Sequence, residues 1–313
     1  MTIEKKMGML IDGQWSNEDQ RRLNKSGAFE RPVSPFRSWL GEDPFTVEAS
    51  RYHLFVNAGC PWAYRTILYR SVKSLASTIS ISYTRPAAGG QGWTFEGVGE
   101  PLLGAEHIHN VYTASTPDFT GRCTVPVLWD KKDQTIVSNE SADIIRMMND
   151  QFDALPGVNA VDFYPLEHRA EIDALNEWIY SDVNNGVYRC GFAQSQSAYD
   201  EAYAKLFRAL DVLDTMLKDQ RYLCGDVVTE ADWRLFATLV RFDAAYYGQF
   251  KCNRNRLVEF ENLWPYTRDL YAYPGVSETV DIAAIKGIYY GSRPPGIIPG
   301  GPDLDFSEAV NRA

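Results

Sequence analysis

The sequence predicts a two-part protein, in which an N-terminal α/β half precedes a C-terminal half made of helices alone. In the first half, a short apolar run over 54–56 leads into apolar residues at helical spacing over 67–75. An alternating segment over 79–83 is typical of a strand. From about residue 166 onward, apolar residues recur only at helical spacing. A length of 313 residues also favours two domains over one.

Two further strands and a helix complete the first half. Residues 124–129 and 135–137 are expected to form a hairpin, and residues 139–143 open a helix. Pro126 lies inside the first of these strands, where a proline is tolerated only at the first residue or after a cis bond. The order β-α-β followed by β-β-α is that of a thioredoxin-like domain.

The remaining segments set the expected domain boundaries. Residues 1–50 lack sustained periodicity and are expected to wrap around the fold. A long segment rich in Gly, Pro, Thr and His is expected to be an irregular insertion. The predicted order is an extension over 1–50, a thioredoxin-like domain over 51–150 with the insertion at about 85–122, a linker over 151–165, a helical domain over 166–285 and an irregular tail over 286–313.

Composition and charge argue against several classes of function. The formal net charge of −10 disfavours nucleic acid or an anionic membrane surface as the main partner. The sequence shows no apolar run of about eighteen residues and no apolar leader, so neither a membrane span nor a secretory signal is expected. The five cysteines are odd in number and scattered, which is typical of the reducing cytoplasm. The four histidines form no ligand cluster, and we expect no metal.

Cys60 is the residue that the pattern selects for chemistry. It lies at the predicted strand-to-helix turn, and Pro61 takes the first helical position, where a missing N–H costs nothing. A thiol there faces the positive end of the helix, which favours the nucleophilic thiolate. Ala63 stands where a second cysteine would allow an internal disulfide, so a thiol from outside must release any mixed disulfide on Cys60. The sequence therefore predicts a monothiol enzyme.

Seven short segments, taken in order, resemble one known family. The first of them contains Cys60 and reads Asn-Ala-Gly-Cys-Pro-Trp-Ala. The segments are 57–63, 92–95, 122–130, 139–143, 184–188, 250–253 and 296–302. Over about residues 10–302 the chain resembles the glutathionyl-hydroquinone reductases, also called Xi-class glutathione transferases. The resemblance implies a helical glutathione-transferase domain after the thioredoxin-like one, glutathione as co-substrate, an aromatic conjugate as substrate, and a homodimer.

The expected glutathione site draws on residue chemistry and on the resemblance together. Val125 precedes the proline and can offer a backbone edge to the cysteinyl main chain of glutathione. Glu140 is expected to hold the γ-glutamyl ammonium, and Ser141 with the helix amides its carboxylate. Trp93 and Arg122 are expected to close the site, Arg122 toward the glycyl carboxylate. The alternatives are ordinary packing for Trp93 and a solvated charge for Arg122.

The acceptor pocket is expected between the domains, with Tyr188, Tyr289 and Tyr290 as its lining. A phenol can donate a hydrogen bond to a hydroquinone oxygen and stack on its ring. Tyr188 and Tyr289 are assigned to catalysis mainly by the resemblance. Arg65, one turn beyond Cys60, is either a support for the thiolate or a surface ion pair, and we favour the ion pair.

The chain departs from the family pattern at four positions where a histidine is frequent. These positions are occupied by Tyr64, Gln249, Ile288 and Arg293. If one of the family's imidazoles contacts the acceptor, substrate choice or the protonation step differs here.

The leading hypothesis is a two-step exchange through a Cys60–glutathione mixed disulfide, which releases a hydroquinone and then oxidised glutathione. An omega-like thioltransferase or dehydroascorbate reductase would share Cys60 and the glutathione site but would need a more open pocket. A non-catalytic binding module with the same fold is the alternative outside enzymes. An unreactive Cys60 at neutral pH would favour that alternative.

Overall fold

The computed structural model describes residues 8–17, 26–86, 90–95, 99–291, 296–310 and 312. The chain divides into two compact units, and each is treated by itself. The first unit takes the described residues within 1–21, 33–161 and 287–298. The second takes those within 22–32, 162–286 and 299–313. The N-terminal segment that was expected to wrap around the fold therefore contributes to both units.

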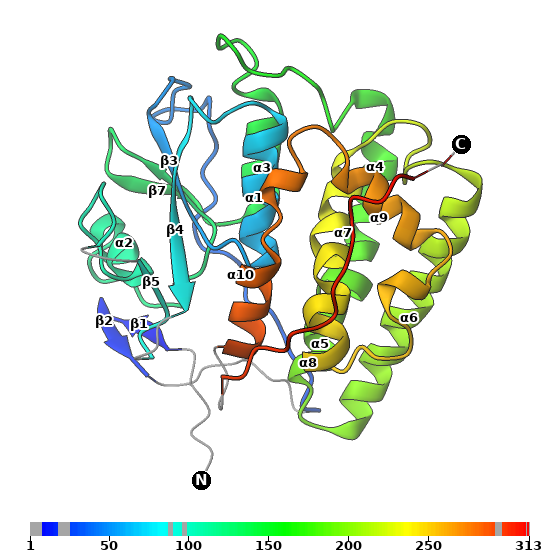
Figure 1. Cartoon of the computed structure of the whole chain (residues 1–313). Helices are drawn as coiled ribbons and strands as arrows, with labels where there is room; N and C mark the ends of the chain where they lie inside the picture. Colours follow the sequence, from blue (N-terminus) through cyan, green and yellow to red (C-terminus); the bar gives the residue numbers. More distant parts are fainter. Residues whose placement is uncertain are drawn as a thin grey trace. The chain divides into compact units, whose positions relative to one another are not determined.

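The first unit is built on a five-stranded sheet with the strand order β5-β4-β3-β6-β7 (Figure 1). Its strands are β3 (Tyr52–Val56), β4 (Ser80–Pro86), β5 (Trp93–Phe95), β6 (Val127–Asp130) and β7 (Thr135–Ser138). The central strand β3 pairs parallel with β4 and antiparallel with β6. All five residues of β3 are buried, as expected for a strand covered on both faces. A separate hairpin joins β1 (Met9–Ile11) to β2 (Gln14–Ser16).

Three helices cover this sheet. Helices α1 (Pro61–Val72) and α3 (Ser141–Asp150) pack against each other on one face, and α2 (Ile108–Ser115) lies on the other (Figure 1). The parallel pair β3–β4 is joined through α1, and the hairpin β6–β7 leads into α3. The predicted thioredoxin-like architecture is confirmed.

The expectation of an irregular insertion over 85–122 is wrong. Strand β5 pairs antiparallel with the end of β4, and α2 buries one side of its two turns. Both elements escape a periodicity argument because β5 has only three residues and α2 only eight. The described part of this segment therefore contains two regular elements, and α2 contacts both β5 and β7.

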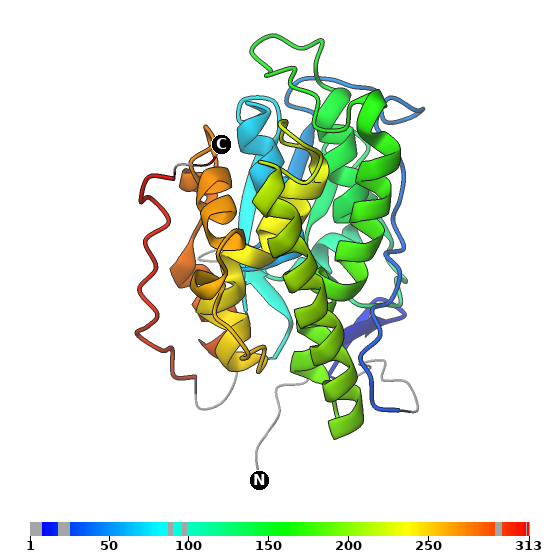
Figure 2. The same cartoon turned by 90° about the vertical axis from the view of Figure 1, so that its right-hand side faces the viewer.

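The second unit consists of helices. Its α-helices are α4 (Arg169–Ile179), α5 (Gly186–Phe192), α6 (Gln196–Asp219), α7 (Glu230–Arg241), α8 (Tyr247–Gln249), α9 (Leu263–Tyr271) and α10 (Ile282–Lys286). Short 3-10 turns are η1 (Leu166–His168), η4 (Leu257–Glu259) and η5 (Ser277–Thr279), and π turns are η2 (Tyr180–Asn184) and η3 (Phe242–Tyr246). Helix α7 is buried along its whole length, with α4 and α9 packed against it. The long light-green helix of Figure 2 is α6, which packs along α5. The predicted all-helical domain is confirmed.

The tail expected to be irregular over 286–313 is irregular only in part. It starts at the last residue of α10 and continues into a π turn, η6 (Gly287–Gly291), which belongs to the first unit. Burial of side chains accounts for the regular structure of α10 and η6, because Ile285 and Tyr289 are both buried. The Lys286 ammonium also donates to the Gly300 carbonyl at 2.9 Å.

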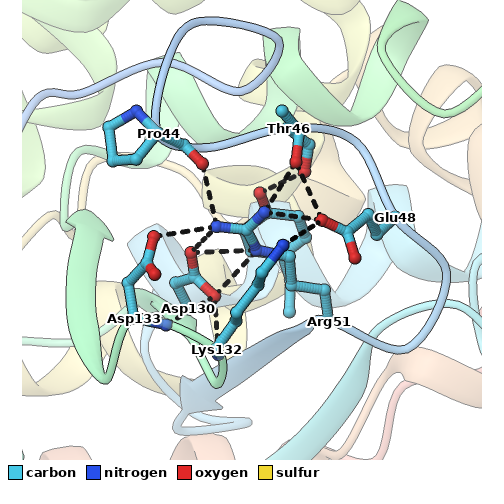
Figure 3. Close-up of polar contacts among 8 residues, drawn as sticks. Pro44, Thr46, Glu48, Arg51, Asp130, Lys132 and Asp133 are labelled. Carbon is cyan, nitrogen blue, oxygen red and sulfur yellow. Dashed lines mark hydrogen bonds and ion pairs between the residues drawn. The ribbon is translucent and has the colours of Figure 1, made fainter.

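A charge network fixes the start of β3 (Figure 3). The Arg51 guanidinium donates to both carboxylate oxygens of Asp130, and it also contacts Glu48 and Asp133. The Arg51 and Asp130 side chains are 3% and 0% exposed. Burial acts to raise the pKa of Asp130, but the hydrogen bonds and charge of Arg51, together with the backbone amides of Lys132 and Asp133, outweigh it, so the pKa lies below the ordinary value. The network therefore ties the chain entering β3 to the end of β6.

Candidate active site

Cys60 lies where β3 ends and α1 begins. It is the N-cap residue of α1, with extended backbone angles (φ −75°, ψ 122°), and Pro61 follows as the first helical residue. Asn57 shapes the turn, because its side-chain oxygen accepts from the Gly59 amide at 3.0 Å and its carbonyl accepts from the Cys60 amide at 3.2 Å. The predicted place of Cys60 at a helix N-terminus is confirmed. No acidic residue lies in the first turn of α1 to oppose a thiolate.

The backbone of Val125 lies beside this thiol. The Val125–Pro126 bond is cis, which is one of the two alternatives expected for Pro126, and β6 begins at the next residue. The Cys60 sulfur is 3.9 Å from the Val125 carbonyl oxygen, and both residues are buried. The structure therefore brings together the two groups that the sequence assigned to the cysteinyl part of glutathione.

Glu140 and Ser141 start the neighbouring helix. Glu140 is the N-cap of α3, and its carboxylate accepts from the Ala142 amide at 3.1 Å. Ser141 is the first residue of α3 and is buried. Its hydroxyl oxygen accepts from the Arg65 guanidinium at 3.4 Å. Because Arg65 follows Cys60 by one helical turn, this contact links the N-terminal turns of α1 and α3.

The expectation that Arg65 lies at the surface is wrong. Arg65 is only 2% exposed, and its guanidinium lies 4.8 Å from the centroid of the Trp62 ring. Sequence position alone shows that Arg65 lies on α1, but not that α3 covers this side of the helix. A buried guanidinium near Cys60 and Ser141 adds positive charge where an anionic sulfur and a ligand carboxylate are expected.

Tyr112 is a site residue that the sequence did not reveal. Its hydroxyl donates to the Thr124 carbonyl at 2.9 Å and accepts from the Thr124 amide and the Asn139 side chain. These partners immediately precede Val125 and Glu140, so one phenol holds both backbone segments. Burial raises the pKa of Tyr112 to about 12, so the group stays protonated. The signal was hidden because α2 lies in the segment expected to be irregular.

Trp93 and Arg122 are both half-buried. Trp93 opens β5 and pairs with Pro86 of β4. Arg122 follows Gly121, whose amide and carbonyl both bond Leu10 at 2.9 Å. These contacts place both residues on ordered backbone of the first unit. Their role toward glutathione stays a prediction.

Tyr188 lies on α5 of the second unit, within a group of packed rings. Its ring centroid is 5.3 Å from that of Phe250 and 6.0 Å from that of Phe192. The Arg31 guanidinium lies 4.9 Å from the same centroid and donates to the Asn185 side chain at 2.8 Å. The protein's own groups thus pack on the Tyr188 ring. A ligand is therefore expected to meet its edge and hydroxyl rather than to stack on it.

Tyr289 and Tyr290 lie on η6 of the first unit, Tyr289 buried and Tyr290 half-buried. Because Tyr188 belongs to the second unit, their joint use in an acceptor pocket stays a prediction. Among the positions where the family often has histidine, Tyr64 is buried in α1, and Gln249 and Ile288 are half-buried. Arg293 lies outside the described residues.

The described residues contain no group of three or more His, Cys, Asp or Glu side chains arranged to hold a metal ion. None of the described helices has both the length and the apolar composition to cross a membrane. All five cysteines are buried, and none of them forms a disulfide within the chain. For Cys123, burial raises the pKa far above the usual range, so this thiol stays protonated.

Comparison with known proteins identifies the family. A model of the N-terminal domain of glutathione S-transferases matches residues 59–151, and a model of their C-terminal domain matches residues 196–269. The chain is 46% identical to the glutathionyl-hydroquinone reductase YqjG of Escherichia coli (strain K12), over 98% of each chain. It is 44% identical to the glutathionyl-hydroquinone reductase PcpF of Sphingobium chlorophenolicum, over 95% of this chain and 96% of that protein.

Comparison with solved structures supports the same family. The glutathione-bound structure of YqjG matches with a TM-score of 0.84 and 47% identity, over 87% of this chain and 94% of that one. A Xi-class glutathione transferase from Natrialba magadii matches with a TM-score of 0.90 and 40% identity, over 99% and 98% of the two chains. The chain therefore belongs to the glutathione transferase family, within the Xi class that contains the glutathionyl-hydroquinone reductases.

Proposed function

We propose that this protein reduces glutathionyl-hydroquinones to hydroquinones, with glutathione as the reductant. The observation that carries the proposal is the Cys60 thiol at the N-terminus of α1, 3.9 Å from the Val125 carbonyl oxygen. The relatives named as glutathionyl-hydroquinone reductases support the substrate class. The protein is then a thiol-dependent oxidoreductase with a catalytic cysteine.

In the first step, the Cys60 thiolate attacks the sulfur of the glutathionyl group. The bond between that sulfur and the ring carbon breaks, a sulfur–sulfur bond forms, and the ring carbon takes up a proton. In the second step, the thiolate of a free glutathione attacks the glutathionyl sulfur of the mixed disulfide. Oxidised glutathione leaves and the Cys60 thiolate returns, so the kinetics are ping-pong.

The glutathionyl group is proposed to extend from Cys60 to the start of α3. Val125 pairs with its cysteinyl backbone, as an added strand beside β6. Glu140 holds the γ-glutamyl ammonium, while Ser141 and the first amides of α3 hold the γ-glutamyl carboxylate. Trp93 and Arg122 close the site, with Arg122 toward the glycyl carboxylate. The glutathione-bound structures of two Xi-class relatives support glutathione as the ligand.

The hydroquinone ring is proposed to meet the hydroxyls of Tyr188 and Tyr289, with Tyr290 lining the same pocket. A phenol that donates to a ring oxygen stabilises the keto-like form of the leaving ring, which helps the ring carbon to accept its proton. The packing of Arg31 and Phe250 on Tyr188 supports a hydrogen-bonding role over a stacking one.

Mass spectrometry of a single turnover tests the function. Reduced protein is mixed with a glutathionyl-hydroquinone, and the intact protein and the released ring are measured before and after free glutathione is added. One glutathione on Cys60 together with free hydroquinone, then loss of the adduct, is the expected result. An adduct formed only from small disulfides, with the conjugate left intact, would instead make the protein an omega-like thioltransferase.

We further propose a cytoplasmic homodimer. The five free thiols are consistent with a reducing compartment. Sedimentation analysis of the purified protein is expected to give twice the mass of the chain.

A further inference from the structure

A short part of the N-terminal segment, residues 33–38, lies along the end of β7 and the start of α3. The Ser38 amide donates to the Val137 carbonyl at 3.0 Å, and the Asn139 amide donates to the Phe36 carbonyl at 3.1 Å. The Phe36 amide donates in turn to the Asn139 side chain at 3.2 Å. These bonds join segments about 100 positions apart in the sequence, just before Glu140.

Two side chains of this segment reach the first turn of α3. The Ser34 hydroxyl donates to Oε2 of Glu140 at 2.9 Å. The Arg37 guanidinium donates to both carboxylate oxygens of Asp143, each at 2.7 Å. Glu140 and Asp143 thus each have a hydrogen-bond partner in residues 33–38, a segment that precedes the first strand of the thioredoxin-like sheet.

We propose that Ser34 is a positioning residue of the glutathione site, which holds the Glu140 carboxylate in place for the γ-glutamyl ammonium and so favours glutathione over simpler thiols. Arg37 assists by pairing the charge of Asp143 at the same helix end. The inference rests on the proposed role of Glu140, but it does not depend on which conjugate the enzyme reduces.

The geometry of the two donors explains how Ser34 acts. The Ala142 amide bonds Oε1 of Glu140, and the Ser34 hydroxyl bonds Oε2. Oε1 also accepts from the Ser141 hydroxyl at 3.5 Å. A carboxylate oxygen can accept two hydrogen bonds, so Oε2 keeps capacity for a ligand ammonium. A glutamate side chain loses rotamer freedom when it binds a ligand, and a carboxylate fixed at both oxygens has already lost that freedom. Removing the hydroxyl therefore weakens binding without changing the chemistry at Cys60.

Arg37 acts through charge. Asp143 lies in the first turn of α3, close in sequence to Ser141 and to the amides proposed to bind the γ-glutamyl carboxylate. An unpaired carboxylate there would repel that ligand group. The Arg37 side chain is 50% exposed, so solvent screens its effect. We therefore expect a smaller contribution from Arg37 than from Ser34.

The test compares Ser34→Ala, Ser34→Thr and Ser38→Ala. Ser38 is the matched control, because it lies in the same segment and bonds β7 through its backbone amide. Calorimetry measures binding of reduced glutathione to the reduced protein. Stopped-flow kinetics measure how fast oxidised glutathione and bis(2-hydroxyethyl) disulfide each form a mixed disulfide with the Cys60 thiol. Thermal unfolding is recorded for every variant.

Ser34→Ala is expected to weaken glutathione binding about 5- to 10-fold, less than the loss of a direct hydrogen bond to a charged group, because Ser34 acts on the ligand only through Glu140. The rate at which bis(2-hydroxyethyl) disulfide reacts with Cys60 should be unchanged in Ser34→Ala. Ser34→Thr should recover most of the glutathione affinity, and Ser38→Ala should match the wild type. Equal glutathione affinity in Ser34→Ala and Ser38→Ala would overturn the proposal, as would equal losses of rate with both disulfides. Normal glutathione binding without any Cys60 adduct would instead reject the proposed function alone.

Discussion

The two ends of β3 differ in how their polar groups are satisfied. At the start, Arg51 and Asp130 form a buried ion pair that Glu48 and Asp133 extend (Figure 3). At the other end, Asn57 bonds backbone groups around Cys60, and the first turn of α1 has no carboxylate. The strand between them has only five residues, all buried.

The difference separates stability from chemistry. Charges that satisfy one another leave little capacity for a ligand, so the Arg51 end is expected to serve the fold. A helix N-terminus with a thiol and a nearby backbone edge offers donors and acceptors suited to a ligand, so the Cys60 end is expected to serve the reaction. Substitutions at the two ends should therefore give effects of different kinds.

The largest expected effect is that of Cys60→Ser. A serine hydroxyl is not ionised at neutral pH, so reduction of a glutathionyl-hydroquinone should fall by at least about 10³-fold. The urea midpoint should change little, because the side chains have nearly the same shape. Steady-state release of hydroquinone checks the rate. Retained reduction in Cys60→Ser would mean that another group is the nucleophile.

Arg51→Met should have the opposite effect, a loss of stability with little change in the reactivity of Cys60. It leaves the Asp130 carboxylate buried without its main partner, and the free energy of unfolding should drop by about 3–5 kcal/mol. Reactivity of Cys60 per folded molecule should stay within about twofold. Urea unfolding and thiol alkylation rates measure the two quantities. The double variant Arg51→Met/Asp130→Asn should recover part of the stability, and an unchanged urea midpoint in the single variant would contradict the stabilising role.

His53 makes the stability of the same strand depend on pH. Burial, assisted by the charges of Lys131 and Arg70, lowers its pKa to about 4. As pH falls below about 6.5, the unfolded chain takes up the proton first, so stability is lost between about pH 6.5 and 4, by up to about 3 kcal/mol.

His53→Gln keeps a polar partner for the Ser80 hydroxyl, which lies 2.7 Å from the His53 ring nitrogen. In His53→Gln the unfolding midpoint should therefore change less with pH between about pH 6.5 and 4. His168→Gln, at a more exposed histidine, is the matched control. Identical slopes in wild type and His53→Gln would show that His53 does not carry this dependence.

The smallest of these effects concerns Asn57. Its side chain holds both the Gly59 amide and the Thr84 carbonyl, so Asn57→Ala should loosen the turn that presents Cys60. We expect the rate of adduct formation to fall about 10-fold, consistent with about 1.4 kcal/mol from these bonds. Asn57→Asp, which keeps the acceptor for Gly59, should lose less. Equal rates in all three proteins would place the control of the turn elsewhere.

Sequence alone was sufficient where the determining interactions are local. A cysteine before Pro61 and a glutamate before Ser141 mark helix starts, because capping involves residues within about four positions. The same holds in part for Pro126, because its place in an apolar strand run left two alternatives, the first residue of the strand or a cis bond. The fold class and the central site residues follow from such patterns and from the resemblance.

Tertiary structure decided what surrounds those residues. The Ser34–Glu140 contact spans 106 positions, and the Arg65–Ser141 contact spans 76. Whether Arg65 meets solvent or α3, and whether the Tyr112 hydroxyl meets Thr124 or water, depends on how distant elements pack. Periodicity assigns a residue to a helix or strand, but the element that packs against it is fixed only when the chain folds.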